Sequence, residues 1–232
     1  MESWRGGIEA NLRDVSARLE AAATRAGRDL GAARLMAVTK TVPVERIQHA
    51  LDLGLRLVGE NRVQEAREKQ PLLHGDFELH LIGHLQSNKA GVAADLFASI
   101  DSVDSLELAE RLSRLAVERG RILQILLEVN TSGEPAKFGF ETGTVEPRAV
   151  ELAALPGLDV RGLMTLGPVP ESGRDPRPCF VALRELRDRL QQRLSRPFPE
   201  LSMGMSGDFE CGVEEGSTLI RVGSALFGPR RA

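Results

Sequence analysis

A lysine follows directly after a short apolar stretch near the start of the chain. Residues 35–38 read Leu-Met-Ala-Val, and Thr39 and Lys40 come next, before Pro43. A continuous apolar run is typical of a parallel strand that is covered on both faces, and α/β folds carry their chemistry at the carboxyl ends of such strands. An amine held there can have a lowered pKa and attack a carbonyl to form a Schiff base. Alternatively, Lys40 simply extends from a strand end into water.

Two stretches that contain serine and glycine lie near the other end of the chain. Ser206 and Gly207 come shortly after Met203, and Gly223 with Ser224 form the second stretch. Glycine lets the backbone approach an anion, while free N–H groups and hydroxyls donate hydrogen bonds to it. After the last two strands of a barrel, such loops commonly bind phosphate. A pair of ordinary turns is the alternative.

A Schiff-base lysine together with a phosphate site predicts a ligand that carries both an aldehyde and a phosphate, such as pyridoxal 5′-phosphate (PLP). Arg221 stands two residues before the second stretch. From there it could face the pyridine nitrogen and keep it unprotonated, which would weaken the ring as an electron sink. The other interpretation of Arg221 is a surface charge at a strand end.

The histidines and cysteines do not predict a metal site. His84 could carry a proton or bind a metal, but a lone histidine near a helix start is more often a capping or surface residue. No carboxylate or cysteine stands at ligand spacing from it, and the other three histidines are equally isolated. Cys179 and Cys211 are far from any metal-ligand spacing, and two isolated cysteines are typical of a reducing compartment. Cys211 lies just past the first serine–glycine stretch, where it could be reactive.

Apolar runs and helical patterns alternate along the whole chain. An amphipathic helix is expected over residues 7–27, followed by eight strands with helices between them, at 35–38, 55–58, 78–82, 98–103, 122–129, 160–165, 201–203 and 218–222. Such alternation predicts an α/β fold, a closed (β/α)8 TIM barrel with an extra N-terminal helix, as one domain over residues 1–232. An open doubly wound sheet is the alternative, but no Gly-x-Gly-x-x-Gly follows the first strand. The polar segment 130–143 is expected to be a functional loop, and a helix is expected over 149–154.

Composition narrows the possible partners and location. The chain has 232 residues, with 30 basic and 33 acidic side chains mixed along it, a net charge of −3 and no tyrosine. No basic stripe indicates nucleic acid or an anionic membrane surface. The N-terminus lacks the apolar core of a signal peptide, and no apolar run approaches the roughly 20 residues of a membrane span. We therefore expect a cytoplasmic, monomeric protein that binds neither nucleic acid nor membrane.

Seven motifs together resemble the pyridoxal phosphate homeostasis protein family, which is related to the N-terminal barrel of alanine racemase. They run in the family's order through nearly the whole chain: Ala-Val-Thr-Lys40, Gly59-Glu-Asn-Arg-Val-Gln-Glu65, His80-Leu-Ile-Gly-His-Leu-Gln-Ser-Asn-Lys89, Glu128-Val-Asn130 with Lys137-Phe-Gly139, Gly162-Leu-Met-Thr165, Met203-Gly-Met-Ser-Gly-Asp208 and Gly216-Ser-Thr-Leu-Ile-Arg-Val-Gly223.

The resemblance implies a fold-type III barrel in which PLP forms a Schiff base with Lys40. The two serine–glycine pairs would hold the phosphate, Arg221 would face the ring nitrogen, and Asn61 would lie beside the cofactor. The full set of cofactor-binding residues would be Lys40, Asn61, Met203, Ser206, Gly207, Arg221, Gly223 and Ser224. The family is expected to bind and buffer PLP, and to deliver it to PLP-dependent apo-enzymes.

A protein without catalytic turnover is the function that the sequence favours. Alanine racemases use a second base, a tyrosine from a second domain and subunit, and this sequence has no tyrosine and no sign of a second domain. An amino-acid racemase or decarboxylase on the same barrel is the main alternative, and a Schiff-base aldolase without bound cofactor is another. Lys89 and Lys137 are candidates for a second, weaker aldehyde site.

Overall fold

A closed ring of parallel strands forms the centre of the computed structural model, which describes residues 3–168 and 172–229. Pairing between β4 and β5 closes the sheet, so the expected barrel is confirmed and the open sheet is excluded. The additional strand β6 pairs only with β5, at its carboxyl end. The strands are β1 (Arg34–Val38), β2 (Leu57–Glu60), β3 (Glu78–Leu81), β4 (Ser99–Val103), β5 (Leu123–Asn130), β6 (Phe140–Glu141), β7 (Leu158–Met164), β8 (Glu200–Met205) and β9 (Leu219–Val222).

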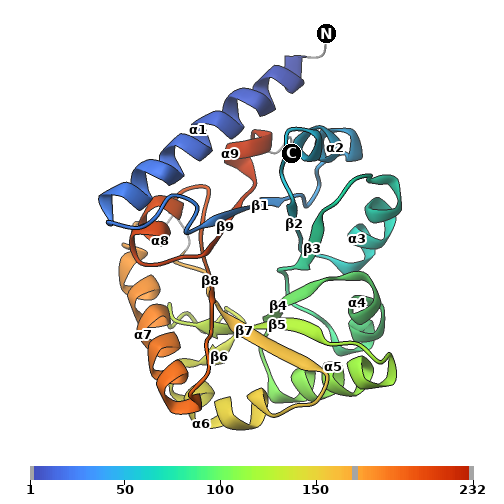
Figure 1. Ribbon diagram of the computed structural model, residues 1–232, viewed down its shortest axis with the longest axis vertical. Helices are drawn as coiled ribbons and strands as arrows, with labels where there is room; N and C mark the ends of the chain where they lie inside the picture. The colour runs from blue at the N-terminus through green and yellow to red at the C-terminus, as the bar shows by residue number, and fades with distance from the viewer. Residues whose placement is uncertain (1–2, 169–171, 230–232) are drawn as a thin grey trace.

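Helices lie outside the ring of strands, as Figure 1 shows. Each helix packs on the sheet through an apolar face. Ser105 caps the start of the helix Leu106–Glu118 (α5) by accepting a hydrogen bond from the Leu108 amide at 3.3 Å. The helices are α1 (Ser3–Arg25), α2 (Val44–Asp52), α3 (Val63–Lys69), α4 (Ala90–Leu96), α5 (Leu106–Glu118), α6 (Thr142–Ala153), α7 (Arg177–Leu194), α8 (Phe209–Glu214) and α9 (Ser224–Phe227), with 3₁₀ turns η1 (Gln70–Leu72) and η2 (Ser87–Lys89).

The alternation of side chains along each strand separates two kinds of core. Ala37 on β1 packs outward with residues of the surrounding helices, whereas Met36 and Val38 point inward. Inside the ring they meet Leu57, Ile82 and Leu219 in a small apolar cluster. The rest of the interior includes buried polar and charged groups, so the barrel is not filled by apolar side chains alone.

Helix α1 covers the outside of the barrel where β1 and β9 meet. Its apolar residues recur at helical spacing, and Ile8, Val15 and Ala22 are all buried against the outer faces of these strands and against α8 and α9. In Figure 1 the blue α1 lies beside the red α9 and α8. Gly27, with φ of 64°, adopts the left-handed conformation that ends the helix. The extra N-terminal helix of the prediction is therefore present.

The segment expected to be a long loop is shorter than predicted. Residues 140–141 pair with β5, and α6 begins at Thr142 rather than near Ala149. Gly139 makes the close approach possible, because a Cβ there would lie 2.8 Å from the Asn130 nitrogen and its φ is 112°. Pro147 lies inside α6, between its first residue and the predicted helix start at Ala149.

All strands in residues 3–168 and 172–229 belong to this one sheet. The division of residues 1–232 into a single domain stays a prediction. Within 3–168 and 172–229, no helix combines the length and the apolar character needed to cross a bilayer.

Candidate functional site

The carboxyl ends of β1 and β9 open into a cleft of about 700 Å³. Lys40, which follows β1, lines this cleft together with Gly223 and Ser224, which follow β9. Because neighbouring parallel strands end on the same face of the barrel, residues that are 183 positions apart in sequence share one cavity. The structure thus brings the predicted amine and the second predicted phosphate loop together.

The two serine–glycine stretches contact each other directly. Ser206, in the turn after β8, accepts hydrogen bonds at its Oγ from the backbone nitrogens of Gly223, at 3.2 Å, and Ala225, at 3.3 Å. A Cβ added to Gly207 would meet no atom within 4 Å, so the space beside this backbone is open. These bonds place the two serine–glycine stretches together beside the cleft that Lys40 lines.

Asn61 follows β2 on the same face of the barrel. Its Oδ1 is buried and has no hydrogen-bond partner among the described residues. Buried polar atoms are normally paired, so this oxygen is a plausible contact for a ligand's donor group. Gly83, which follows β3, lies against the Asn61 backbone: a Cβ on Gly83 would lie 2.3 Å from the Asn61 carbonyl oxygen.

Gly83→Ala should therefore displace Asn61. We expect a loss of about 1–3 kcal/mol in the free energy of unfolding, because the obstructing atoms are backbone and cannot rotate away. Urea unfolding would measure the loss. Gly143→Ala is the matched control, since a Cβ there meets nothing within 4 Å; equal stability of the two variants would contradict the steric argument.

Arg221 extends from β9 into the barrel interior and is only 3% exposed. Its Nη1 donates to Ser202 Oγ at 2.6 Å and its Nη2 donates to the Thr165 carbonyl oxygen at 2.7 Å. These contacts tie β9 to β8 and to the end of β7. Burial lowers the pKa of Arg221, and the nearby carboxylates of Asp101, Glu128 and Asp208 oppose that shift. The alternative of a surface charge is thus excluded.

Glu128 is a buried carboxyl that sequence reasoning noted only as part of a motif. It lies on β5 and is 5% exposed. Burial raises its pKa to about 7, the charge of Asp104 adds to this effect, and Arg221 opposes it. A glutamate within the most apolar predicted strand was the signal that could have identified it.

We expect Glu128→Gln to stabilise the protein at alkaline pH. A folded-state pKa above the unfolded value of 4.5 means that folding favours the protonated form, so the contribution of Glu128 to stability is largest below pH 4.5 and is lost as pH rises through about 7. The variant should be more stable than wild type at pH 8 by up to about 3 kcal/mol and similar at pH 5. Denaturant unfolding at both pH values checks this, and a difference that does not depend on pH would contradict it.

Four other residues that the sequence singled out are buried in the core, already paired, exposed away from the cleft, or weakly nucleophilic. The Met203 side chain is fully buried in the core between sheet and helices, so the structure does not bring it together with Lys40. Lys137 donates to the Gly167 carbonyl oxygen at 2.5 Å and to Glu134 at 3.2 Å, whereas Lys89 is exposed on η2. Burial raises the pKa of Cys211 to about 11, which keeps the thiol protonated and weakly nucleophilic at neutral pH.

His80 and His84 each pair with a carboxylate. His84 Nδ1 lies 2.8 Å from Asp104, and its ring stacks on Phe138 with centroids 3.9 Å apart. His80 lies 3.0 Å from the buried Asp101. Among the described residues, no group of three or more potential ligands could hold a metal ion.

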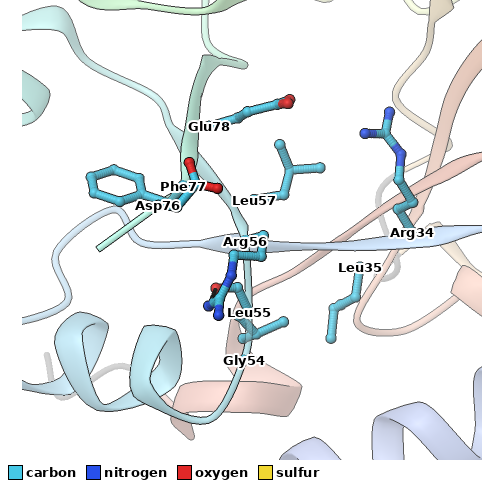
Figure 2. A pocket seen from close by; sticks show the side chains of 9 residues that line it. All are labelled: Arg34, Leu35, Gly54, Leu55, Arg56, Leu57, Asp76, Phe77 and Glu78. Atoms are coloured by element: carbon cyan, nitrogen blue, oxygen red, sulfur yellow. Dashed lines mark hydrogen bonds between the residues drawn. The ribbon is translucent and has the colours of Figure 1, made fainter. Parts of the chain in front are cut away.

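A second cleft, of about 360 Å³, lies at the opposite end of the barrel. Figure 2 shows its lining side chains, which come from the starts of the first three strands and the loops before them, including Arg34, Arg56 and Glu78. In this fold the amino ends of the strands contribute to stability, and the chemistry occurs at the carboxyl ends. The Lys40 cleft, at the carboxyl ends of the strands, is therefore the candidate functional site.

Comparisons with known proteins identify the family. Residues 10–231 match the model of the alanine racemase N-terminal domain. A pyridoxal phosphate homeostasis protein of Aquifex aeolicus is 42% identical over 221 residues, which cover 95% of this chain and 97% of the relative. PipY of Synechococcus elongatus, solved with PLP bound, is 38% identical with a TM-score of 0.78, and the match covers 92% of this chain and all of PipY.

Alanine racemase of Clostridium difficile shares the fold alone, with 14% identity and a TM-score of 0.77 over 97% of this chain and 56% of the racemase. The expected relation to the racemase barrel is confirmed by this likeness and by the family model. The chain therefore belongs to the family of pyridoxal phosphate homeostasis proteins, built on the barrel of the alanine racemase N-terminal domain.

Proposed function

We propose that this protein binds PLP at the Lys40 cleft and takes part in PLP homeostasis as a reversible carrier of the cofactor. The observation that carries the proposal is the shared cavity of Lys40, Gly223 and Ser224. The complex of PLP with PipY, a relative that is 38% identical, supports it. When bound, PLP supplies an aldehyde carbon that reacts reversibly with primary amines.

The residues of the site fit this cofactor. Lys40 Nζ would form the covalent bond, while Ser206, Gly207, Gly223 and Ser224 would hold the phosphate through the hydroxyls and N–H groups that converge there. Arg221, whose guanidinium donates to Ser202 Oγ and to the Thr165 carbonyl oxygen, would present that guanidinium toward the ring nitrogen. Asn61 would use its unpaired Oδ1 beside the cofactor.

A carrier without catalytic turnover is the version of this function that we favour. The Aquifex aeolicus relative carries the name of a homeostasis protein, and these 232 residues contain no tyrosine that could serve as the second base of a racemase. Steady turnover of any amino acid by the purified protein, lost in Lys40→Ala, would overturn this. Delivery to apo-enzymes, the monomeric state and the cytoplasmic location stay predictions.

A visible absorption spectrum before and after borohydride, followed by peptide mass mapping, tests the proposal. We expect an absorption band that disappears on reduction and a pyridoxyl mass on the peptide that contains Lys40. A protein that stays colourless and unmodified after PLP is added would contradict the proposal. Modification by a sugar phosphate and borohydride, without any affinity for PLP, would favour a Schiff-base aldolase instead.

A further inference from the structure

The turn that carries Lys40 is held from behind by a second lysine. Lys69, the last residue of α3, donates from its Nζ to the carbonyl oxygen of Thr39 at 2.7 Å. The same ammonium donates to Glu60 at 3.0 Å and to Glu65 at 2.6 Å. With its side chain only 14% exposed, this cation is largely removed from solvent. It therefore fixes the peptide group that immediately precedes Lys40.

On the other side of Lys40 the backbone is strained. Thr41 has a φ of 62°, in the left-handed region that a β-branched residue rarely adopts. Its amide donates to Glu65 Oε1 at 2.5 Å, and that same oxygen accepts from Lys69. Strain of this kind persists only where the surroundings hold it, and it is often found at functional sites.

Glu60 connects the turn to the neighbouring strand. This residue ends β2, is 2% exposed, and accepts from the Thr39 hydroxyl at 2.7 Å as well as from Lys69. Burial raises the pKa of Glu60, and the bonds from Thr39 and Lys69 oppose that shift. One ammonium is thus shared by two carboxylates and one carbonyl group. Removal of the ammonium would leave the two carboxylates facing each other.

We propose that Lys69, Glu60 and Glu65 form a positioning network for Lys40, which holds the turn at residues 39–41 so that the Lys40 amine faces the Gly223 and Ser224 side of the cleft. The inference rests on the proposed function. The network would act through orientation. A ligand anchored by its phosphate reacts with an amine only where its aldehyde lies at the correct distance from that amine, and a mobile turn would not hold the amine there.

The test compares the rates at which variants capture PLP and pyridoxal, which has the same aldehyde but no phosphate. We expect Lys69→Met to slow the capture of PLP at Lys40 by about tenfold or more and to leave the capture of pyridoxal nearly unchanged. Lys69→Arg should restore part of the PLP rate, because it keeps the cation. Lys89→Met, at an exposed lysine of η2, is the matched control and should behave as wild type.

Hydrogen exchange provides a readout that does not depend on the cofactor. The Thr41 amide, which donates to Glu65, should exchange faster in Lys69→Met and in Glu65→Gln, while amides in the strands keep wild-type rates. If Lys69→Met does not fold, Glu65→Gln decides the question, since Glu65 lies nearer the surface.

Two results would overturn the positioning role. One is a variant in which the Thr41 amide exchanges faster but PLP is captured at the wild-type rate. The other is a variant that captures PLP and pyridoxal equally more slowly than wild type does.

If the wild-type protein captures PLP no faster than pyridoxal, the phosphate site of the proposed function is contradicted instead. Exchange of the Thr41 amide in the variants would still decide whether Lys69 holds the turn.

Discussion

Lys40→Ala should take up no PLP that borohydride can fix to the protein, and its absorption band should be absent. Lys40 is the lysine that lines the cleft with the Gly223 and Ser224 loop, so no other amine there could replace it among the described residues. The fold should be unaffected, with a change in the free energy of unfolding within about 0.5 kcal/mol, because a partly exposed side chain at a strand end packs little of the core.

Spectra and peptide mapping of the reduced variant check this result. Lys89→Ala and Lys137→Ala serve as controls, and both should keep full labelling of the Lys40 peptide. Stoichiometric labelling of Lys40→Ala at either of these lysines would show that the main aldehyde site lies elsewhere. Loss of cooperative unfolding in Lys40→Ala would show that the lysine is structural.

Arg221→Met should lower the free energy of unfolding by about 3–5 kcal/mol near pH 7.5, the usual cost of removing one partner from a buried charged group. The substitution keeps an apolar chain but removes the donors to Ser202 and to the Thr165 carbonyl. The substitution also removes the cation that lies near three carboxyl groups, those of Asp101, Glu128 and Asp208.

The loss in free energy of unfolding caused by Arg221→Met should be smaller at lower pH. Burial raises the pKa of Glu128 to about 7 and raises that of Asp208, so both take up protons more readily than ordinary carboxyls, and protonation removes the repulsion. Urea unfolding at pH 7.5 and 5.5 measures the difference. Arg34→Met, at the opposite end of the barrel where the arginine side chain is 49% exposed, should cost no more than about 1 kcal/mol. Equal losses for the two arginines would contradict the buried-charge argument.

The order of elements was determined by local sequence. Apolar runs at a period that fits strands, followed by amphipathic stretches, indicated eight strand–helix units, and eight such units can close only as a barrel of this size. The sequence also placed Lys40, Ser206 and Gly223 near the carboxyl ends of their strands, since each comes shortly after a predicted strand. The resemblance to a family then added the cofactor, which the spacing of residues alone had left open to other interpretations.

Only the tertiary structure decided which side chains meet. Ser206 accepts a hydrogen bond from the Gly223 nitrogen because β8 and β9 are neighbours. Lys69 donates to the Thr39 carbonyl oxygen because α3 packs behind β1 and β2. The Met203 side chain points outward because alternate residues of a strand face opposite sides. The motif that contains Met203 does not determine which of its residues face the barrel interior.

Local sequence determines propensity and period, and these suffice to predict the order of the elements and the strand ends, whereas the pairing of β4 with β5 that closes the barrel is seen only in the structure. The environment of a charge depends instead on distant residues. How much water the closed barrel excludes decides whether Arg221 is a surface group or a buried cation. It also decides whether the pKa of Glu128 is near 4.5 or near 7. That exclusion is a property of the whole ring of strands, and so it could not be predicted from any one segment of the chain.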